Sequence, residues 1–329
     1  MSPQPPAVLE GTSPALPERG RILVVPREAS GSRRDRFLAV ALDVSRSEAQ
    51  RWIAAGHVTV EGALRSASGH VREGERVACN PITPATTTAL PEEGVEFAVL
   101  YVDDDVIVVN KPAGLVVHPA RGHETGPLVN GLLARGLFRG QDAADERPGI
   151  VHRLDKGTSG VMVIARTPEA REALKAQFQA HSIERAYRAL VVGEAAETTH
   201  DTLHGRHPRD RMRFSTRVRT GKRAVTHVRV LDRLPGATHV ACTLQTGRTH
   251  QIRVHLAESG TPVLGDPLYG KPPHDRRVRA IGERLGHQAL HARLLGFLHP
   301  TTGRLLRFEV EPPADFDEAM RALADAEGP

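Results

Sequence analysis

Short runs of β-branched and other apolar residues recur along the chain beyond residue 96. Of all features of the sequence, this pattern restricts the possible folds of the chain most strongly. Each run is five to eight residues long, which is the length of an ordinary strand. We predict strands at residues 97–102, 106–110, 161–165, 186–192, 224–231, 239–244 and 305–310.

Helical patterns are fewer in the same region. Thr167 and Pro168 are suited to an N-cap and a first helical turn, so we predict a helix that continues through Phe178. A second helix is predicted at residues 249–259, ending at Gly260. Strands outnumber helices and do not alternate with them as strand–helix–strand units. We therefore predict an α+β fold with a large mixed, mainly antiparallel β-sheet flanked by helices.

Composition divides the chain into segments. Residues 1–31 are rich in proline and show little periodicity, so we predict a flexible tail. A small compact domain is predicted at residues 32–80, followed by a linker rich in Pro and Thr at residues 81–96. The large domain is assigned to residues 97–314, and residues 315–329 are predicted to be a C-terminal tail.

The small domain has a helix–helix–strand pattern. We predict its first helix at residues 34–42. The second is predicted to be capped by Ser47, with Gln50 as the capping-box partner, and to end at Gly56. A short strand is predicted at residues 57–60.

Positive charge is concentrated in one segment. The whole chain has a formal net charge of +5 and a pI near 9.6. Residues 206–223 hold eight Arg and Lys residues against the single acid Asp210, a net charge of +7. A solvated loop or hairpin would account for such a run, but a phosphate backbone is the natural counter-ion. We predict that this segment contacts nucleic acid.

Composition also bears on the compartment. No apolar run approaches the roughly 20 residues that span a bilayer. Residues 1–20 lack the basic start and apolar stretch of a secretory signal. Cys79 and Cys242 lie far apart and form no metal-type pair, which fits a reducing compartment. We expect a cytoplasmic protein without a membrane segment.

Asp155 lies in a loop at residues 152–160, between two apolar runs. Gly157 and Gly160 allow the backbone to turn tightly there. Taken alone, an Asp in such a loop is more often a turn or cap residue than a nucleophile.

The segment from Arg153 to Gly160 resembles the active-site signature of the pseudouridine synthases of the RluA/RluD family. The resemblance extends from about Ser32 to Pro312. Further blocks that match in the same order are residues 109–115, 186–193, 246–255 and 262–270, followed by 290–292 and 299–300.

The resemblance implies an enzyme that converts uridine in RNA to pseudouridine. This isomerisation breaks the bond from ring nitrogen to sugar, turns the base and rejoins it through carbon. It involves no redox change and requires no external energy, so we expect no cofactor and no metal. The presence of the small N-terminal domain is typical of the family members that act on large-subunit ribosomal RNA, so we predict 23S rRNA as the substrate.

The resemblance also implies roles for single residues. Asp155 would start glycosidic cleavage, either through a covalent adduct or by assisting proton removal from the sugar. Arg253 matches the arginine that pairs with this carboxylate, and an adjacent cation favours its ionised form. Tyr187 matches the tyrosine that stacks on the target base, and Arg153 a residue that fills the space the extruded base leaves. Without the resemblance, Tyr187 would be an ordinary strand aromatic and Arg253 a helix-surface arginine.

Residues 32–80 resemble the small RNA-binding domain known from a ribosomal small-subunit protein, the S-four fold. In that fold two short helices present basic residues to structured RNA. The matching elements are residues 34–38, 45–49 and 56–62. Together with the basic segment, the resemblances give the candidate RNA-contacting residues Arg33, Arg46, Arg51, Arg153, Arg206, Arg209, Arg211, Arg213 and Arg248.

Other motifs are rejected. His287 and His291 have the spacing of a zinc-binding helix, but Gln288 stands where the general base Glu is needed. We interpret His291 as a packed, hydrogen-bonded histidine. Residues 265–271 imitate a phosphate-binding loop, but a proline replaces the Ser or Thr that would bind magnesium. Residues 103–105 are interpreted as a turn.

Two alternatives stay open. One is an enzyme of the same family that acts on tRNA. The other is a non-catalytic RNA-binding protein that assists ribosome assembly on the same scaffold. Such a protein would be expected to have lost Asp155, Tyr187 or Arg253, and all three are present. We expect a monomer.

Overall fold

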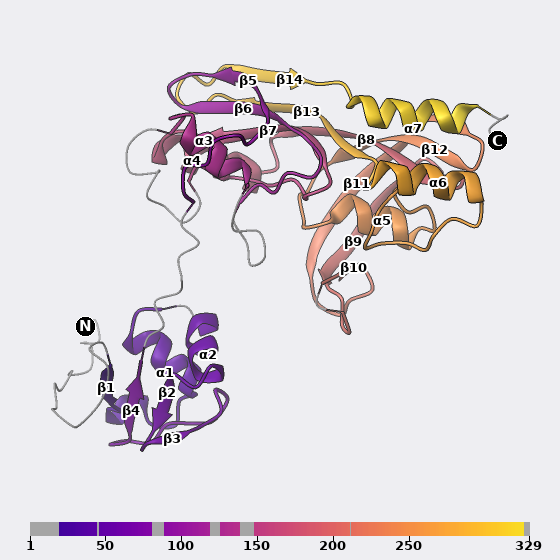
Figure 1. The fold of residues 1–329 in the computed structure, drawn as a ribbon. Helices are drawn as coiled ribbons and strands as arrows, with labels where there is room; N and C mark the ends of the chain where they lie inside the picture. The colour runs from indigo at the N-terminus through magenta and orange to yellow at the C-terminus, as the bar shows by residue number, and fades with distance from the viewer. Residues whose placement is uncertain are drawn as a thin grey trace. The chain divides into compact units, whose positions relative to one another are not determined.

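The computed structural model describes residues 20–44, 46–80, 89–118, 126–138, 148–210 and 212–325. The chain forms two compact units, residues 1–86 and residues 87–329 (Figure 1). Each unit has its own sheet and its own hydrophobic core.

In its described residues, the N-terminal unit is a four-stranded antiparallel sheet with two α-helices and a short 3-10 helix. The strand order is β1-β4-β2-β3. The strands are β1 (Arg21–Val24), β2 (Val58–Val60), β3 (Ala63–Leu64) and β4 (Arg76–Cys79), and the helices are η1 (Arg27–Ala29), α1 (Arg34–Ala41) and α2 (Arg46–Ala54). Phe37 and Leu38 of α1 and Trp52 of α2 are buried in one core with strand residues. The predicted helices and the strand at residues 57–60 are therefore present, with shifts of one or two residues at their ends.

Two predictions for this unit were wrong. Residues 21–24 are not a tail, because β1 pairs with β4 and Leu23 is 1% exposed. Their run is short and stands between proline-rich segments, which hides it in the sequence; residues 1–19 lie outside the described part of the chain. The helix α2 begins at Arg46, so Ser47 is inside the helix rather than at its cap. Gln50 donates to Asp35 Oδ2 at 2.6 Å instead of completing a capping box.

The second unit is built on a ten-stranded sheet with the order β10-β9-β11-β12-β8-β13-β7-β6-β5, and β14 pairs with β13. The strands are β5 (Ala98–Val102), β6 (Val106–Lys111), β7 (Ser159–Ala165), β8 (Glu184–Val192), β9 (Thr198–Arg206), β10 (Phe214–Ser215), β11 (Lys222–Leu234), β12 (Ala237–Leu244), β13 (Leu290–Leu298) and β14 (Leu305–Glu309). The β13–β7 pair is parallel, and the other neighbouring strands of the described chain pair antiparallel. The predicted mainly antiparallel sheet is confirmed.

The seven predicted strands all form, but two long strands were missed. The first, β9, has the sequence TTHDTLHGR, in which few apolar residues alternate with polar ones. The second, β13, has the sequence LHARLLGFL, whose apolar spacing fits a helix as well as a strand. Yet β13 lies in the middle of the sheet and joins β8 to β7.

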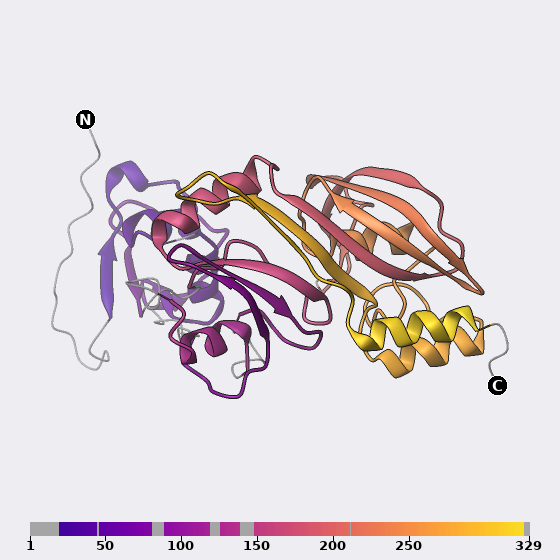
Figure 2. The same cartoon turned by 90° about the horizontal axis from the view of Figure 1, so that it is seen from above.

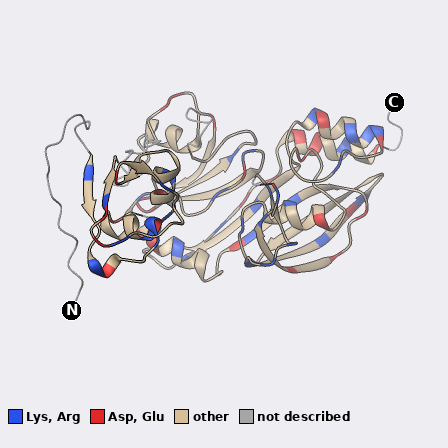
Figure 3. Cartoon of the chain, turned by 90° about the horizontal axis from the view of Figure 1, so that it is seen from below, with Lys and Arg blue, Asp and Glu red and all other residues tan. Residues whose placement is uncertain are grey.

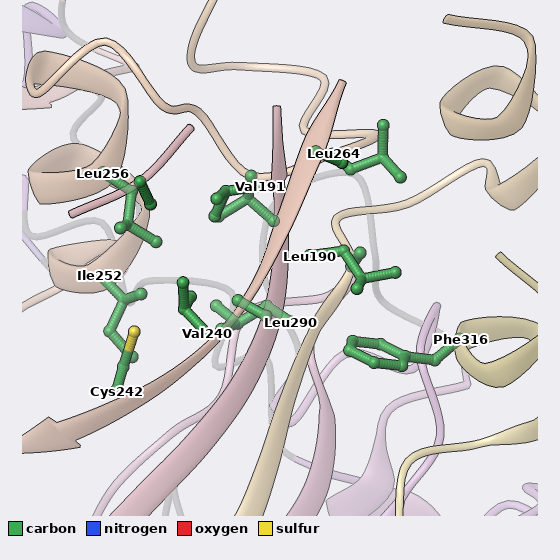
Figure 4. Close-up of a cluster of buried hydrophobic side chains, with 14 of the residues drawn as sticks. Leu190, Val191, Val240, Cys242, Ile252, Leu256, Leu264, Leu290 and Phe316 are labelled. Carbon is green, nitrogen blue, oxygen red and sulfur yellow. The ribbon is translucent and has the colours of Figure 1, made fainter. Parts of the chain in front are cut away.

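Helices cover parts of this sheet and fill its core. They are α3 (Leu128–Ala134), α4 (Pro168–Gln179), α5 (Gln251–Glu258), α6 (Arg276–Leu285) and α7 (Ala314–Ala324). Thr167 caps α4 as predicted, its side chain accepting from Ala170 N. Leu190 and Val240 of the sheet, Ile252 of α5 and Phe316 of α7 share one buried cluster (Figure 4).

The helix α7 corrects the predicted C-terminal tail. Its residues Phe316, Ala319 and Leu323 are buried, and it lies beside α6 in both views (Figures 1 and 2). Arg277 of α6 ties the two together by donating to the carbonyls of Ala322 and Leu323. The tail prediction therefore applies at most to residues 326–329, which lie outside the described residues.

Candidate active site

The loop that carries Asp155 ends where β7 begins. The Asp155 carbonyl accepts from Thr158 N at 3.0 Å, which closes a turn. Gly160 then pairs with Ala292 in the parallel β7–β13 ladder and has φ of +117°. A Cβ at position 160 would collide with the Ala292 backbone, so only glycine fits there. This close approach fixes the exit of the loop against the centre of the sheet.

Asp155, Tyr187 and Arg253 line one pocket, although they lie far apart in sequence. Asp155 comes from the loop before β7, Tyr187 from β8 and Arg253 from α5. The Arg253 Nη1 atom donates to Asp155 Oδ2 at 2.8 Å. Arg153 and Arg248 lie on the rim of the same pocket. The structure thus brings together the residues that the motif resemblance indicated.

Arg253 is held from its other side by Asp266, which sequence reasoning did not single out. Nε and Nη2 of Arg253 donate to the two carboxylate oxygens of Asp266, at 2.7 and 2.8 Å. Burial alone would lower the pKa of Arg253, but the hydrogen bonds and charges of Asp266 and Asp155 raise it above its usual value. The guanidinium therefore stays charged and fixed beside Asp155.

Tyr187 is half-buried and packs against the core on both sides of the sheet centre. Its neighbours in the sheet are Cys242 on β12 and Ala292 on β13. Burial raises the pKa of the Tyr187 phenol, with the charge of Arg185 opposing and that of Asp155 adding to the rise. The phenol is therefore neutral at physiological pH, in the same pocket as the carboxylate.

The side chain of Lys111 contacts the backbone of the loop that carries Asp155. It is fully buried, and its Nζ donates to the carbonyls of Pro112, Leu115 and Lys156 at 2.9, 2.8 and 3.2 Å. Burial lowers the pKa of Lys111 to about 7, and the charge of Asp155 acts in the opposite direction. Its block of sequence was part of the resemblance, but its contact with the loop follows only from the fold.

A second cavity of about 510 Å³ adjoins the first and shares Asp155, Tyr187 and His250 with it. Its lining is rich in cations: Arg153, Lys175, Arg185 and Arg248. Lys175 and Arg185 were not predicted, since neither lies in the basic segment at residues 206–223. Arg185 is buried, with Nη2 donating to the carbonyl of Gln245 at 3.3 Å. The site is suited to a polyanion that reaches Asp155.

The basic segment at residues 206–223 is partly strand rather than a loop. Arg206 ends β9 and Arg223 lies in β11, while β10 between them pairs with β9. Arg206 lies over the ring of Phe214 at 4.5 Å, and Arg209 is exposed. Figure 3 marks the Lys and Arg residues of the described chain in blue.

One arginine of this hairpin, Arg213, contacts Tyr269, which is a neighbour of Arg253. The Arg213 guanidinium lies 5.2 Å from the ring centre of Tyr269, which in turn lies 5.0 Å from the Arg253 guanidinium. Arg211 lies outside the described residues. The basic hairpin is therefore connected to the site through Tyr269.

In the N-terminal unit two of the predicted arginines, Arg33 and Arg46, share an internal partner. Arg33 donates to both oxygens of Asp35, and Arg46 Nε lies 3.1 Å from Asp35 Oδ2. Asp35 is fully buried, and its hydrogen bond with Arg33 holds its pKa well below the usual range. The side chains of Arg33 and Arg46 remain 40% and 52% exposed, and Arg51 is exposed as well. These arginines thus stabilise the domain while still facing solvent.

The rejected motifs have structural roles. His291 lies in β13, where its ring nitrogens are within hydrogen-bonding distance of Ser159 Oγ at 2.8 Å and the Val310 carbonyl at 3.1 Å. Asp103 Oδ1 accepts from the backbone N–H groups of Asp105 and Val106, as expected of a turn residue. Within the described ranges, no three His, Cys, Asp or Glu residues are grouped to hold a metal.

The site is a carboxylate–guanidinium pair in a cationic cleft, which suits a polyanionic ligand, and the similarities of the chain are more specific. The profile of the RNA pseudouridylate synthase family matches residues 105–258, and that of the S4 domain matches residues 35–77. The chain therefore belongs to the RNA pseudouridylate synthase family and is an RNA pseudouridine synthase.

Individual relatives agree over nearly the full chain. Ribosomal large subunit pseudouridine synthase D of Xanthomonas campestris is 44% identical over 93% of this chain and 93% of its own length. The protein of the same name in Pseudomonas aeruginosa is 42% identical, over 90% and 93%. The solved structure of Human RNA Pseudouridylate Synthase Domain Containing 1 covers 73% of this chain and 99% of its own, with 25% identity and a TM-score of 0.54. Among the helices that the structure describes, none has the length and apolar character to cross a membrane.

Proposed function

We propose that this enzyme isomerises specific uridines of large-subunit ribosomal RNA, with Asp155 as the nucleophile and without a cofactor. The observation that carries the proposal is the pairing of Asp155 Oδ2 with Arg253 Nη1 at 2.8 Å at the bottom of a cationic cleft. The cation favours the ionised carboxylate. With Oδ2 engaged, Oδ1 is the oxygen left to react.

The chemistry requires little else from the protein. The ionised Asp155 starts cleavage of the glycosidic bond, either by forming an adduct with the sugar or by assisting removal of a sugar proton. The detached uracil turns in the pocket and rejoins through its carbon. Tyr187, neutral and next to Asp155, offers a flat ring on which the base rests.

The uridine must leave its stack before it reaches Asp155. Arg153 is exposed at the entrance of the pocket, which supports a role in filling the vacated position. The cations of the larger cavity and of the basic hairpin, Arg206, Arg209, Arg211, Arg213 and Arg248 among them, are proposed to follow the phosphate backbone. Arg33, Arg46 and Arg51 are the proposed contacts of the N-terminal domain.

Large-subunit RNA is proposed as the substrate because relatives at 42–44% identity carry it in their names and because an S4 domain precedes the catalytic unit. A protein with this substrate is expected to act in the cytoplasm, where ribosomes assemble. Cys79 and Cys242, both free and buried, are compatible with that compartment. We propose that it acts as a monomer.

A map of pseudouridines in total RNA, from cells with and without this protein, tests the proposal. We expect one or a few large-subunit sites to disappear in its absence and to return with the wild-type chain. They should not return with Asp155→Asn. Loss of tRNA sites instead would move the substrate to tRNA, and an unchanged map would favour the non-catalytic assembly factor.

A further inference from the structure

His250 occupies an unusual backbone position directly before α5. Its φ is +60°, in the left-handed region that non-glycine residues seldom adopt. The strain is tolerated where surrounding contacts fix the side chain, and such residues gather at functional sites. His250 is the N-cap residue, yet its side chain makes no capping hydrogen bond. It lines both cavities beside Asp155 instead.

The contacts of Tyr269 determine which nitrogen of His250 carries the proton. The Tyr269 hydroxyl accepts from the backbone N–H of Phe214 at 2.9 Å. The same hydroxyl lies 2.8 Å from His250 Nδ1. Tyr269 is 3% exposed, so its own proton needs a partner within the protein. Donation to His250 Nδ1 satisfies both groups, and it places the single imidazole proton on Nε2.

The protonated nitrogen faces the reactive carboxylate. His250 Nε2 lies 3.7 Å from Asp155 Oδ1, the oxygen that Arg253 leaves open. Burial lowers the pKa of His250; the charges of Asp155 and Asp266 raise it, and those of Arg253 and Arg153 lower it. The net direction is downward, so the imidazole is neutral near pH 7 and presents an N–H rather than a full charge.

The chain of hydrogen bonds begins in the basic hairpin. Phe214, whose N–H starts it, belongs to β10. Its ring stacks on His204 of β9 at 5.4 Å and meets the His250 ring edge to face at 5.7 Å. Arg213, the preceding residue, lies over the Tyr269 ring. Any shift of this hairpin would therefore move Tyr269 and His250 together.

We propose that His250 is a positioning residue for Asp155, held as the Nε2–H tautomer by Tyr269 and the Phe214 backbone. This relay from Phe214 through Tyr269 to His250 couples the binding of the basic hairpin to RNA with the alignment of the Asp155 carboxylate. At 3.7 Å the Nε2–H group acts on Oδ1 through its dipole rather than through a hydrogen bond, while Arg253 holds Oδ2. The inference rests on the proposed role of Asp155 and adds a link between RNA contact and chemistry.

Tyr269→Phe, His250→Ala and His250→Gln test the relay. Isomerisation frees the hydrogen at carbon 5 of uracil, so tritium release from [5-³H]uridine RNA measures single-turnover rates. The probes are transcribed large-subunit rRNA and, in parallel, total tRNA. We expect Tyr269→Phe and His250→Ala to slow release about tenfold, with RNA affinity within about twofold of wild type. His250→Gln should recover most of the rate, because its amide N–H donates without a ring.

The pH profile separates positioning from a merely structural role. Without the Tyr269 proton, His250 Nδ1 is free to take up a proton at a higher pH. The imidazolium would then pair with Asp155 and withhold Oδ1. The acid limb of the rate profile should therefore move to higher pH in Tyr269→Phe than in wild type. Tyr101→Phe is the matched control, since it removes a hydroxyl bonded to Asp103 at 2.7 Å, outside both cavities.

Unchanged rates in Tyr269→Phe and His250→Ala would overturn the relay. So would equal losses in His250→Ala and His250→Gln, because the donated N–H would then be irrelevant. Thermal unfolding of each variant separates a slowed enzyme from an unfolded one. Tritium release by wild type but not by Asp155→Asn tests the proposed nucleophile in the same assay, so the two hypotheses fail with different results.

Discussion

Asp266 accepts two hydrogen bonds from Arg253, of 2.7 Å from Nε and 2.8 Å from Nη2. The remaining terminal nitrogen of Arg253, Nη1, donates to Asp155. Asp266 also accepts from the backbone N–H groups of Leu268 and Tyr269 and is fully buried. Arg253 is thus oriented by a second carboxylate, which is itself held by two backbone N–H groups. The orientation of the Asp155 carboxylate depends on a residue that does not touch it.

Asp266→Asn should therefore slow catalysis without removing any group that contacts the substrate. One bidentate charged contact is lost, so Arg253 gains freedom and the Asp155 geometry loosens. We expect the single-turnover rate to fall about 10- to 100-fold, while RNA affinity changes little. Asp232→Asn, which alters an exposed acid paired with His239, is the control. A rate equal to that of the control would show that the Asp266 contact is dispensable.

Asp155→Asn and Asp155→Ala should abolish pseudouridine formation while RNA binding largely survives. The amide of Asn has the size of the carboxylate but neither its charge nor its nucleophilicity. Tritium release and electrophoretic mobility shift, measured on the same RNA, check the two halves of this prediction. Turnover by either purified variant would contradict the assignment of Asp155.

Neutralising two arginines of the basic segment should weaken RNA binding and flatten its salt dependence. Each phosphate contact contributes roughly 0.7–0.9 to the slope of log affinity against log salt concentration. For Arg209→Gln with Arg211→Gln we therefore expect the slope to fall by roughly 1.4–1.8. The double variant Arg276→Gln, Arg284→Gln removes as many charges from α6 and is the control. A slope equal to that of wild type would show that Arg209 and Arg211 do not bind phosphate groups of the RNA.

Lys111→Met should change the pH dependence of stability. In the folded protein the pKa of Lys111 is lowered to about 7, whereas an unfolded lysine titrates near its ordinary value of about 10.4. Between these values the unfolded state binds more protons, so wild-type stability gains with rising pH from this group, by at most about 1.4 kcal/mol per pH unit.

The variant lacks that contribution and removes the donor to the carbonyls of Pro112, Leu115 and Lys156. It should be less stable by roughly 1–3 kcal/mol at high pH. Denaturant unfolding of both proteins from pH 7 to 10 gives the difference in free energy. A difference that stays constant with pH would show that Lys111 keeps its proton throughout.

From the sequence it was possible to predict three residues that meet in one pocket, but not the residues that hold them there. Asp155, Tyr187 and Arg253 were predicted because each lies in a motif that resembles those of the family. Asp266 and His250 are close to the site only because α5 and the loop after it fold back onto the sheet. Neither had a pattern of its own, although both lie in blocks that matched the family.

The fold was predictable where local patterns were clean. Strands with apolar alternation, such as β12, and the capped helix α4 formed as expected. The strands β9 and β13 were missed because one is too polar to show alternation and the other too apolar to show a period. The helix α7 was missed because its stability comes from packing Phe316 and Leu323 into a distant core.

The placement of β13 has a consequence for the order of assembly. This strand stands between β8 and β7, which have no direct pairing with each other in the described sheet. β13 thus divides the sheet into two halves. Asp155 comes from the loop before β7, in one half, whereas Tyr187 on β8 and Arg253 on α5 belong to the other half. The two halves can form early from neighbouring segments, but their junction waits for residues near 290. During synthesis, the active site can therefore be completed only after the residues of β13 have been made.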